Sequence, residues 1–322
     1  MQCVAFVHSD NVLWVRGYED GTIETVITTT NIHSPRIVLS DVPYESIDHC
    51  AITPDGTNVI FALLRRNGKT KSCCHDIARG QQKWSQTYKN NISLVCTSNG
   101  IAWYQTVTHK LLAIRLSDGE VVNTWNRVED IFGGISSYSC MSQCTGSKAI
   151  CAVHFQDTHK VVANYDTTPH ILWNGLASAD WLIGADVEHA GLHCYDSSGH
   201  RWSIPAPHKL SPCWHVSVFE GKVYYTTRHT NEQYIDTETL MRMTEEEYEQ
   251  LEKKRQEKEK IDELHVLELD LRTGEKLRSI AMPTCLGWYP FAGGGKAIST
   301  MGVLDYSTMS IQLHDYEKFD WL

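Results

Sequence analysis

The sequence predicts an all-β fold made of repeated antiparallel sheets, and three observations support this class. Many short segments alternate apolar and polar residues, which is typical of strands with one buried face. Turn residues, glycine above all, separate these segments at regular intervals. The combined strand–turn–strand pattern recurs along the chain, for example in LLAIRLSDGEVVNTW (residues 111–125) and LHVLELDLRTGEKLRSI (residues 264–280). Recurrence of one unit along most of the 322 residues indicates a repeat architecture.

Two kinds of hairpin alternate along the chain, and one of each kind makes a four-stranded antiparallel sheet. Turns of the first kind recur mostly at roughly 40–50 residues, which is the repeat length of β-propeller blades. Those that include a glycine contain Gly56, Gly100, Gly146, Gly221 and Gly295. Turns of the second kind are expected in residues 31–35, at Gly80, at Gly119, at Thr168 and Pro169, at Gly199, at Gly274 and near Glu317.

These repeats predict a β-propeller of about seven four-stranded antiparallel blades, formed by residues 1–322 as a single domain. Radial stacking buries both faces of each sheet against its neighbours, whereas a lone sheet leaves its faces and edges exposed. Six or eight blades are alternatives, and an open β-sandwich is the other all-β architecture that fits. The repeat at residues 181–205 lacks one expected strand.

An insertion at residues 237–263 falls between the second and third strands of the sixth predicted blade. Its segment from Thr244 to Glu263 is highly charged. We expect a helix there, because Thr244 and Glu247 have the spacing of a capping box. The helix has too few apolar residues to pack one side against the blade. The sequence therefore predicts a solvated helix that projects from the propeller.

A tryptophan follows several turns of the second kind. An apolar strand, Asp, a glycine-containing turn and then Trp resembles the repeat of quinoprotein-type β-propellers, most closely in YDSSGHRW and HDIARGQQKW. In that family the tryptophan packs between adjacent blades. The Trp-Asp repeat family is the near alternative, but these repeats do not open with its Gly-His pair or close with its Trp-Asp pair. The tryptophans that carry the resemblance are Trp84, Trp125, Trp173 and Trp202.

The chemistry of that family is not implied by the resemblance. Its dehydrogenases are exported and bind a quinone together with a calcium ion, but a fold does not carry the activity of its relatives. We expect no cofactor here. Those enzymes often have a vicinal disulfide, whereas the adjacent Cys73 and Cys74 of this chain are expected to be strand residues that face opposite sides of a sheet.

Composition limits the partners and the compartment. The formal net charge of −10 disfavours nucleic acid as a partner, because surfaces that bind nucleic acid normally show clustered Lys and Arg. No apolar run is long enough for a membrane helix, and the first residues lack the pattern of a secretion signal. Most of the eleven cysteines are expected to be reduced. These features predict a cytoplasmic protein.

The search for catalytic or metal-binding motifs finds no strong signal. The most metal-like spacing is Cys140, Cys144, Cys151 and His154, where we expect buried thiols and no zinc, because these residues fall on strands rather than in the tight turns that zinc ligands occupy. Single histidines, such as His193 and His200, have no nucleophile in a local signature. A hydrolase or lyase with its active site at the mouth of the propeller channel is the alternative function.

The preferred function is a non-catalytic protein–protein interaction scaffold, a subunit of a larger cytoplasmic assembly. In a propeller, the entries to the innermost strands lie on the same face as the loops between second and third strands. The charged helix therefore shares a face with aromatic residues that begin inner strands, and such residues are typical of interface hot spots. The residues predicted to bind a protein partner are Trp181, Trp214, His215, Trp288 and Tyr289 at strand entries, and Tyr248 and Leu251 on the helix.

Overall fold

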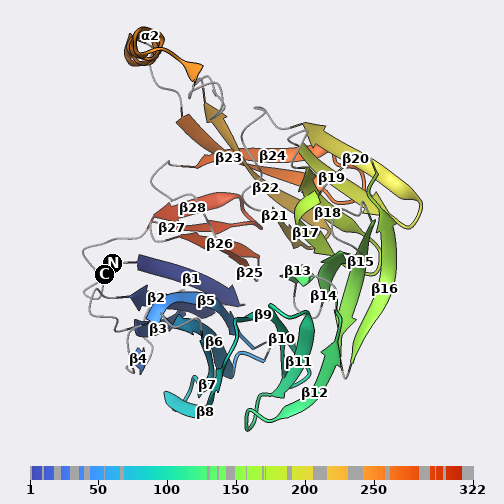
Figure 1. Ribbon diagram of the computed structural model, residues 1–322. Helices are drawn as coiled ribbons and strands as arrows, with labels where there is room; N and C mark the ends of the chain where they lie inside the picture. Colours follow the sequence, from blue (N-terminus) through green and yellow to red (C-terminus); the bar gives the residue numbers. More distant parts are fainter. Residues whose placement is uncertain are drawn as a thin grey trace.

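The structure is a computed structural model in which strands predominate (Figure 1). In the part of the chain that it describes, the expectation of a mainly β fold with one charged helix is confirmed. The described residues are 2–8, 11–17, 23–29, 36–39, 44–53, 55–65, 69–128, 131–135, 138–142, 149–156, 158–168, 170, 172–186, 191–205, 216–230, 242–257, 262–282, 291–293, 295–299 and 302–313.

The described strands form seven four-stranded antiparallel sheets, numbered here in chain order. Sheet 1 contains β1 (Gln2–His8), β2 (Asn11–Gly17), β3 (Ile23–Thr29) and β4 (Arg36–Leu39). Sheet 2 contains β5 (Tyr44–Ile52), β6 (Asn58–Arg65), β7 (Thr70–Asp76) and β8 (Gln81–Tyr88). Sheet 3 contains β9 (Ile92–Ser98), β10 (Ile101–Thr106), β11 (Lys110–Arg115) and β12 (Val121–Asn126). Sheet 4 contains β13 (Ile131–Ile135), β14 (Tyr138–Ser142), β15 (Ala149–Phe155) and β16 (His159–Asp166).

The last three sheets follow the same plan. Sheet 5 contains β17 (Leu172–Ala177), β18 (Leu182–Asp186), β19 (Gly191–Asp196) and β20 (Gly199–Pro205). Sheet 6 contains β21 (Val216–Phe219), β22 (Lys222–Thr230), β23 (Asp262–Asp270) and β24 (Lys276–Met282), with the helix α2 (Glu245–Glu257) between β22 and β23. Sheet 7 contains β25 (Phe291–Gly293), β26 (Lys296–Ser299), β27 (Gly302–Asp305) and β28 (Ser310–Leu313). Every sheet is therefore built from four consecutive strands.

The sheets are arranged in a ring, with the first strand of each nearest the centre (Figure 1). First strands of successive sheets contact each other from β1 through β5, β9, β13 and β17 to β21, and β25 contacts β1. A cluster of buried side chains, including Tyr224 of β22 and Leu304 of β27, joins sheets 6 and 7. Each sheet thus lies between two neighbours in the ring, which is the arrangement that the repeated hairpins predict.

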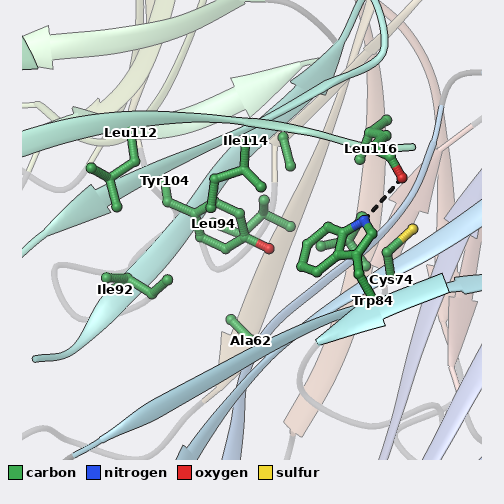
Figure 2. Close-up of a cluster of buried hydrophobic side chains, with 11 residues drawn as sticks. Ala62, Cys74, Trp84, Ile92, Leu94, Tyr104, Leu112, Ile114 and Leu116 are labelled. Carbon is green, nitrogen blue, oxygen red and sulfur yellow. Dashed lines mark hydrogen bonds between the residues drawn. The ribbon is translucent and has the colours of Figure 1, made fainter. Parts of the chain in front are cut away.

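Tryptophans of outer strands make the contacts between neighbouring sheets. Trp84 of β8 is buried among residues of sheets 2 and 3, and its indole Nε1 donates a 2.9 Å hydrogen bond to the carbonyl oxygen of Leu116 (Figure 2). Trp202 of β20 repeats this arrangement between sheets 5 and 6, with a 2.9 Å bond to the carbonyl oxygen of Leu271. The prediction that these tryptophans pack between adjacent blades is confirmed.

A glycine of the next sheet lies directly against each of these indoles. Gly119 and Gly274 occupy the turns between third and fourth strands, with φ of 79° and 72°. A Cβ atom on Gly119 would lie 2.7 Å from a ring carbon of Trp84, and one on Gly274 would lie 2.6 Å from a ring carbon of Trp202. Glycine is therefore required at both positions for two reasons: the positive φ and the close approach of the indole ring.

The other two tryptophans of the predicted set differ from each other. Trp125 of β12 stacks on Trp103 with ring centroids 5.5 Å apart and meets His159 of β16 at 4.9 Å, so it lies between sheets 3 and 4 as expected. The placement of Trp173 in an outer strand is wrong, because it lies in β17, the first strand of sheet 5. The turn expected at Thr168 and Pro169 instead falls in the connection between sheets 4 and 5.

Two further predicted boundaries are also corrected by the structure. The strand that seemed to be missing from residues 181–205 is β17, which precedes them in the chain. In the last repeat, the hairpin of third and fourth strands is β27–β28, with its turn after Asp305. The turn expected near Glu317 lies outside the described residues, as does Gly146.

The guanidinium of Arg278, which a buried carboxylate holds in place, links sheet 6 to sheet 7. The side chain of Glu268 on β23 is fully buried, with Oε1 2.6 Å from Nζ of Lys222 and Oε2 accepting a hydrogen bond from Nε of Arg278. The same guanidinium donates 3.2 Å hydrogen bonds to the carbonyl oxygens of Tyr306 and Ser307 in sheet 7. Burial raises the pKa of Glu268, but hydrogen bonds from Arg278 and Lys222 outweigh burial and leave this pKa below its usual value.

We expect Glu268→Gln to lower the free energy of unfolding near neutral pH by about 1–2 kcal/mol, because two cations lose an ionised partner. The folded-state pKa of Glu268 lies below the unfolded one, so the stabilisation is complete above about pH 4.3 and is lost as the pH falls through the folded value. Urea unfolding at neutral and at acidic pH measures the difference between the two proteins, which should shrink in acid. Glu120→Gln, at an exposed ion pair with Arg115, is the control. A difference that does not change with pH would contradict this assignment.

Candidate functional site

The predicted helix is present, and it begins as the capping box specifies. Oγ1 of Thr244 accepts a 3.3 Å hydrogen bond from the backbone N–H of Glu247, and the Glu247 carboxylate accepts a 2.8 Å bond from the backbone N–H of Thr244. Hydrogen bonds from the backbone and the hydroxyl of Thr244 lower the pKa of Glu247. The expected end at Glu263 is wrong: α2 ends at Glu257, and Asp262 and Glu263 belong to β23, because they pair with β22.

The paired strands β22 and β23, here called the ribbon, lead from sheet 6 toward α2. β22 and β23 pair along their full length, from Lys222 opposite Asp270 to Thr230 opposite Asp262. Their neighbour β21 pairs with β22 only as far as Tyr225, so the distal part of the ribbon extends past the first strand of the sheet. Figure 1 shows α2 beyond the end of this ribbon and apart from the seven sheets. The helix is therefore inserted between two strands that pair along their full length.

The surface of α2 is mostly polar. Its first turn carries three exposed glutamates, and Tyr248 has 47% of its surface exposed. Leu251 is half-buried and lies three residues further along, which places it on the same side of the helix as Tyr248. Within the described residues, no helix combines the length and the apolar character that spanning a membrane requires.

Of the strand-entry residues of the predicted partner site, Trp181 lies within the described residues. The expectation that Trp181 begins an inner strand is wrong: it precedes β18, the second strand of sheet 5. Antiparallel connectivity places this turn at the opposite end of the sheet from loops between second and third strands, where α2 is inserted. Trp181 is half-buried against the cluster between sheets 5 and 6. The remaining entry residues, Trp214, His215, Trp288 and Tyr289, lie outside the described residues.

The described structure instead brings three histidines together on sheet 5. His193 lies on β19 and His200 on β20, while His170 lies in the connection that enters the sheet. One ring nitrogen from each lies within 4.8 Å of the others. Nδ1 of His193 is 3.3 Å from Nε2 of His200, and the rings of His170 and His193 are 3.8 Å apart between centroids. We name these three residues the histidine cluster.

Two further side chains hold the histidine cluster in place. The buried carboxylate of Asp186 has an oxygen 3.9 Å from Nε2 of His193. The hydroxyl of Tyr195 lies 2.5 Å from Nδ1 of His170 and 3.3 Å from the carbonyl oxygen of Thr167. Burial raises the pKa of Tyr195, which keeps its hydroxyl protonated.

The histidine cluster is poorly suited to holding several positive charges. Burial lowers the pKa of His200, and the neighbouring His170 lowers it further. Imidazoles this close repel one another when both are protonated. Asp186 supplies a carboxylate beside His193. For His200 these effects favour the neutral ring, the form in which imidazole binds metals.

Local sequence signatures missed this cluster, although part of it was visible. His193 and His200 fall in the predicted hairpin that turns at Gly199, so their presence on adjacent strands followed from the sequence. The third member, His170, comes from the connection between sheets, and no local pattern links it to the hairpin. A pairwise search of histidines on predicted neighbouring strands would have found two of the three.

The cysteines behave as buried strand residues where they are described. Cys73 and Cys74 are free thiols, and burial raises the pKa of Cys74 to about 12. Cys151 is also buried and donates a 3.0 Å hydrogen bond to the side-chain oxygen of Asn164. Cys144 lies outside the described residues, so the absence of zinc at the Cys140–His154 segment stays a prediction.

No family model and no curated protein matches this chain. Solved structures do match it. A protein in the crystal structure of the mitotic checkpoint complex is similar with a TM-score of 0.55 and 8% identity, over 96% of this chain and 89% of that one. KlHsv2 with loop 6CD replaced by a Gly-Ser linker is similar with a TM-score of 0.57 and 6% identity, over 94% of this chain and 88% of that one.

A third similar structure is that of the dihydro-heme d1 dehydrogenase NirN in complex with DHE. Its TM-score is 0.53 and its identity 11%, over 96% of this chain and 65% of the NirN chain. At such low identities the likeness concerns the fold, because proteins with one fold carry unrelated functions. The chain has a β-propeller fold, as its repeats predict.

Proposed function

We propose that this protein is a non-catalytic interaction scaffold: a single-domain, seven-bladed propeller that acts as a subunit of a larger cytoplasmic assembly. The observation that carries the proposal is α2, a capped helix presented at the end of a paired ribbon and apart from the sheets (Figure 1). A helix of 13 residues is only marginally stable in water by itself. A bound partner would stabilise it.

The side chains of α2 indicate how a protein partner would bind. Tyr248 and Leu251 form a small apolar strip with carboxylates on either side, so the partner needs an apolar groove with basic residues at its rim. Tyrosine is enriched among residues that dominate binding energy, because it buries a large apolar ring and keeps a polar hydroxyl. The net charge of −10 also favours a basic protein surface as the partner.

Similar structures support two parts of the proposal: that the protein is a subunit of an assembly, and that the segment carrying α2 is not needed for folding. One of them belongs to a multiprotein complex, the mitotic checkpoint complex. Another is a propeller whose loop was replaced by a Gly-Ser linker, so a propeller of this kind folds without such a loop. In the present chain, the connection between β22 and β23 is expected to be dispensable for folding in the same way, because long surface loops contribute little to stability.

The test replaces residues 231–261 with a short Gly-Ser linker. We expect unchanged strand content by circular dichroism and a thermal midpoint close to that of the wild type. Binding to the native partner is expected to be lost. The partner is identified by placing a photo-crosslinking residue at position 248 in native extract and comparing the products with those from position 107, an exposed site on sheet 3.

Point variants distinguish the contribution of the helix side chains from the effect of replacing the whole segment. Tyr248→Ala with Leu251→Ala should weaken binding of the crosslinked partner by about 10-fold or more, given the typical loss at an aromatic hot spot. Val107→Ala, at a site that is 65% exposed, is the matched control and should leave binding unchanged. If the linker variant binds the same partner with wild-type affinity, α2 is not the docking element.

A further inference from the structure

We propose that His170, His193 and His200 bind one divalent transition-metal ion of the zinc class on sheet 5. The proposal is independent of the scaffold function and of the Cys140–His154 segment. It rests on the convergence of three ligand nitrogens, on the two groups that orient them, and on the exposure of one side of the cluster.

The spacing of the ligand atoms fits a tetrahedral ion. Zinc–imidazole bonds of about 2.0–2.1 Å place two nitrogens of a tetrahedron about 3.3 Å apart. Nδ1 of His193 and Nε2 of His200 are already 3.3 Å apart. The nitrogen of His170 lies within 4.8 Å of both.

The fold fixes two of the ligands through a hairpin. Tyr195 of β19 pairs with His200 of β20, and an irregularity in the register between Cys194 and Tyr195 shifts the two strands locally. His193 pairs with Ser203 in the same hairpin. The third ligand follows a tight turn, in which the backbone N–H of His170 donates a 2.6 Å hydrogen bond to the carbonyl oxygen of Thr167.

The contacts of Tyr195 favour one ligand nitrogen of His170. The Tyr195 hydroxyl lies 3.3 Å from the carbonyl oxygen of Thr167, to which it can donate, and 2.5 Å from Nδ1 of His170. In the proposed site the hydroxyl accepts a hydrogen bond from Nδ1–H of His170. A proton on Nδ1 makes Nε2 the metal-binding nitrogen.

A carboxylate lies near the other ring nitrogen of His193. An oxygen of Asp186 is 3.9 Å from Nε2 of His193, beyond hydrogen-bond distance, and its negative charge favours a proton on that nitrogen, which leaves Nδ1 as the ligand. A carboxylate behind a histidine is the usual outer contact of metal-binding imidazoles, because it orients the ring and increases its basicity. Asp186 is therefore a positioning residue for the site, not a ligand.

The exposure of the cluster indicates the type of site. His193 is buried and His170 half-buried, whereas His200 is exposed. Three imidazoles with one open side leave the fourth position of the ion to water or to a small anionic or carbonyl ligand. Imidazole ligands suit zinc, copper, nickel and iron, whereas magnesium prefers oxygen ligands, so three imidazoles favour an ion of the zinc class over magnesium.

The experiment titrates metal-free, tag-free protein with Zn²⁺ by calorimetry and with Co²⁺ by visible absorption. We expect one ion per chain and Co²⁺ bands of four- or five-coordinate geometry. His200→Ala should lower the affinity at least about 100-fold, and Asp186→Asn about 10–100-fold, as for other outer contacts. His200 is exposed, so this variant should fold normally, which circular dichroism of the metal-free protein checks.

The matched control is His109→Asn, which removes an exposed histidine from sheet 3 and retains a residue that tolerates its φ of 55°. It should bind Zn²⁺ like the wild type. Two results would overturn the proposal: no saturable Zn²⁺ binding by the wild type, or equal affinity of wild type and a folded His200→Ala variant.

Discussion

Trp84→Ala is expected to lower the free energy of unfolding by about 3–5 kcal/mol, the loss typical of a buried aromatic residue. The indole is 7% exposed and fills the space between sheets 2 and 3. Its removal leaves a cavity beside Tyr104 and Ile114, and it removes the hydrogen bond to the carbonyl oxygen of Leu116. Urea unfolding followed by circular dichroism measures this loss without relying on tryptophan emission.

Two other aromatic variants separate packing from hydrogen bonding. Trp84→Phe retains most of the ring and loses the N–H, so we expect a loss of about 1–2 kcal/mol. Trp125→Ala removes a ring that is only half-buried, and its effect should be smaller than that of Trp84→Ala. If Trp84→Ala and Trp125→Ala lower the free energy of unfolding equally, the deeper burial of Trp84 adds no stability.

Gly274→Ala is expected to lower the free energy of unfolding by about 3 kcal/mol, from two sources. Alanine at φ of 72° costs about 1–2 kcal/mol in backbone strain. Its Cβ would also lie 2.6 Å from a ring carbon of Trp202, and the indole cannot retreat without breaking its bond to Leu271. Overpacking of this kind typically costs about 1–3 kcal/mol. Thermal and urea unfolding both measure the sum.

Gly221→Ala isolates the backbone contribution in the same sheet. Its φ is 73°, and no atom lies within 4 Å of a Cβ added there. We expect a loss of about 1–2 kcal/mol for this variant, clearly below that for Gly274→Ala. If the two variants lose the same amount, the contact between Gly274 and Trp202 contributes nothing to the interface.

Much of the fold was predictable because each repeat carries its own local signals. Gly100 and Gly119, predicted as turn residues, have positive φ and join strands as expected. The prediction failed where turn residues occurred between sheets rather than within one. Thr168 and Pro169 have the chemistry of a hairpin turn, while the strand that follows, β17, has Asn174 and Gly175 in place of regular alternation.

The candidate sites were predictable to different degrees. The helix follows from the local spacing of Thr244 and Glu247, and the structure confirms it. The end of the helix does not follow from local spacing. It depends on the pairing of β23 with β22, and pairing between distant segments leaves no local signal. The histidine cluster depends on a side chain from the connection before β17 reaching the hairpin of β19 and β20, which only the folded ring brings about.

Self-contained sheets have a consequence for hydrogen exchange. In the described part of the chain, main-chain hydrogen bonds stay within a sheet, and neighbouring sheets are joined by side chains such as Trp84, Trp202 and Arg278. Opening of one sheet therefore breaks few amide hydrogen bonds of the next. Two that do cross are those of the Ile92 N–H to Oγ1 of Thr70 and of the Ile131 N–H to Oε1 of Gln105. Amide protons should exchange in groups that correspond to single sheets, with the second and third strands, paired on both sides, protected longest. Loss of one interface indole should then accelerate exchange mainly in the two sheets that it joins.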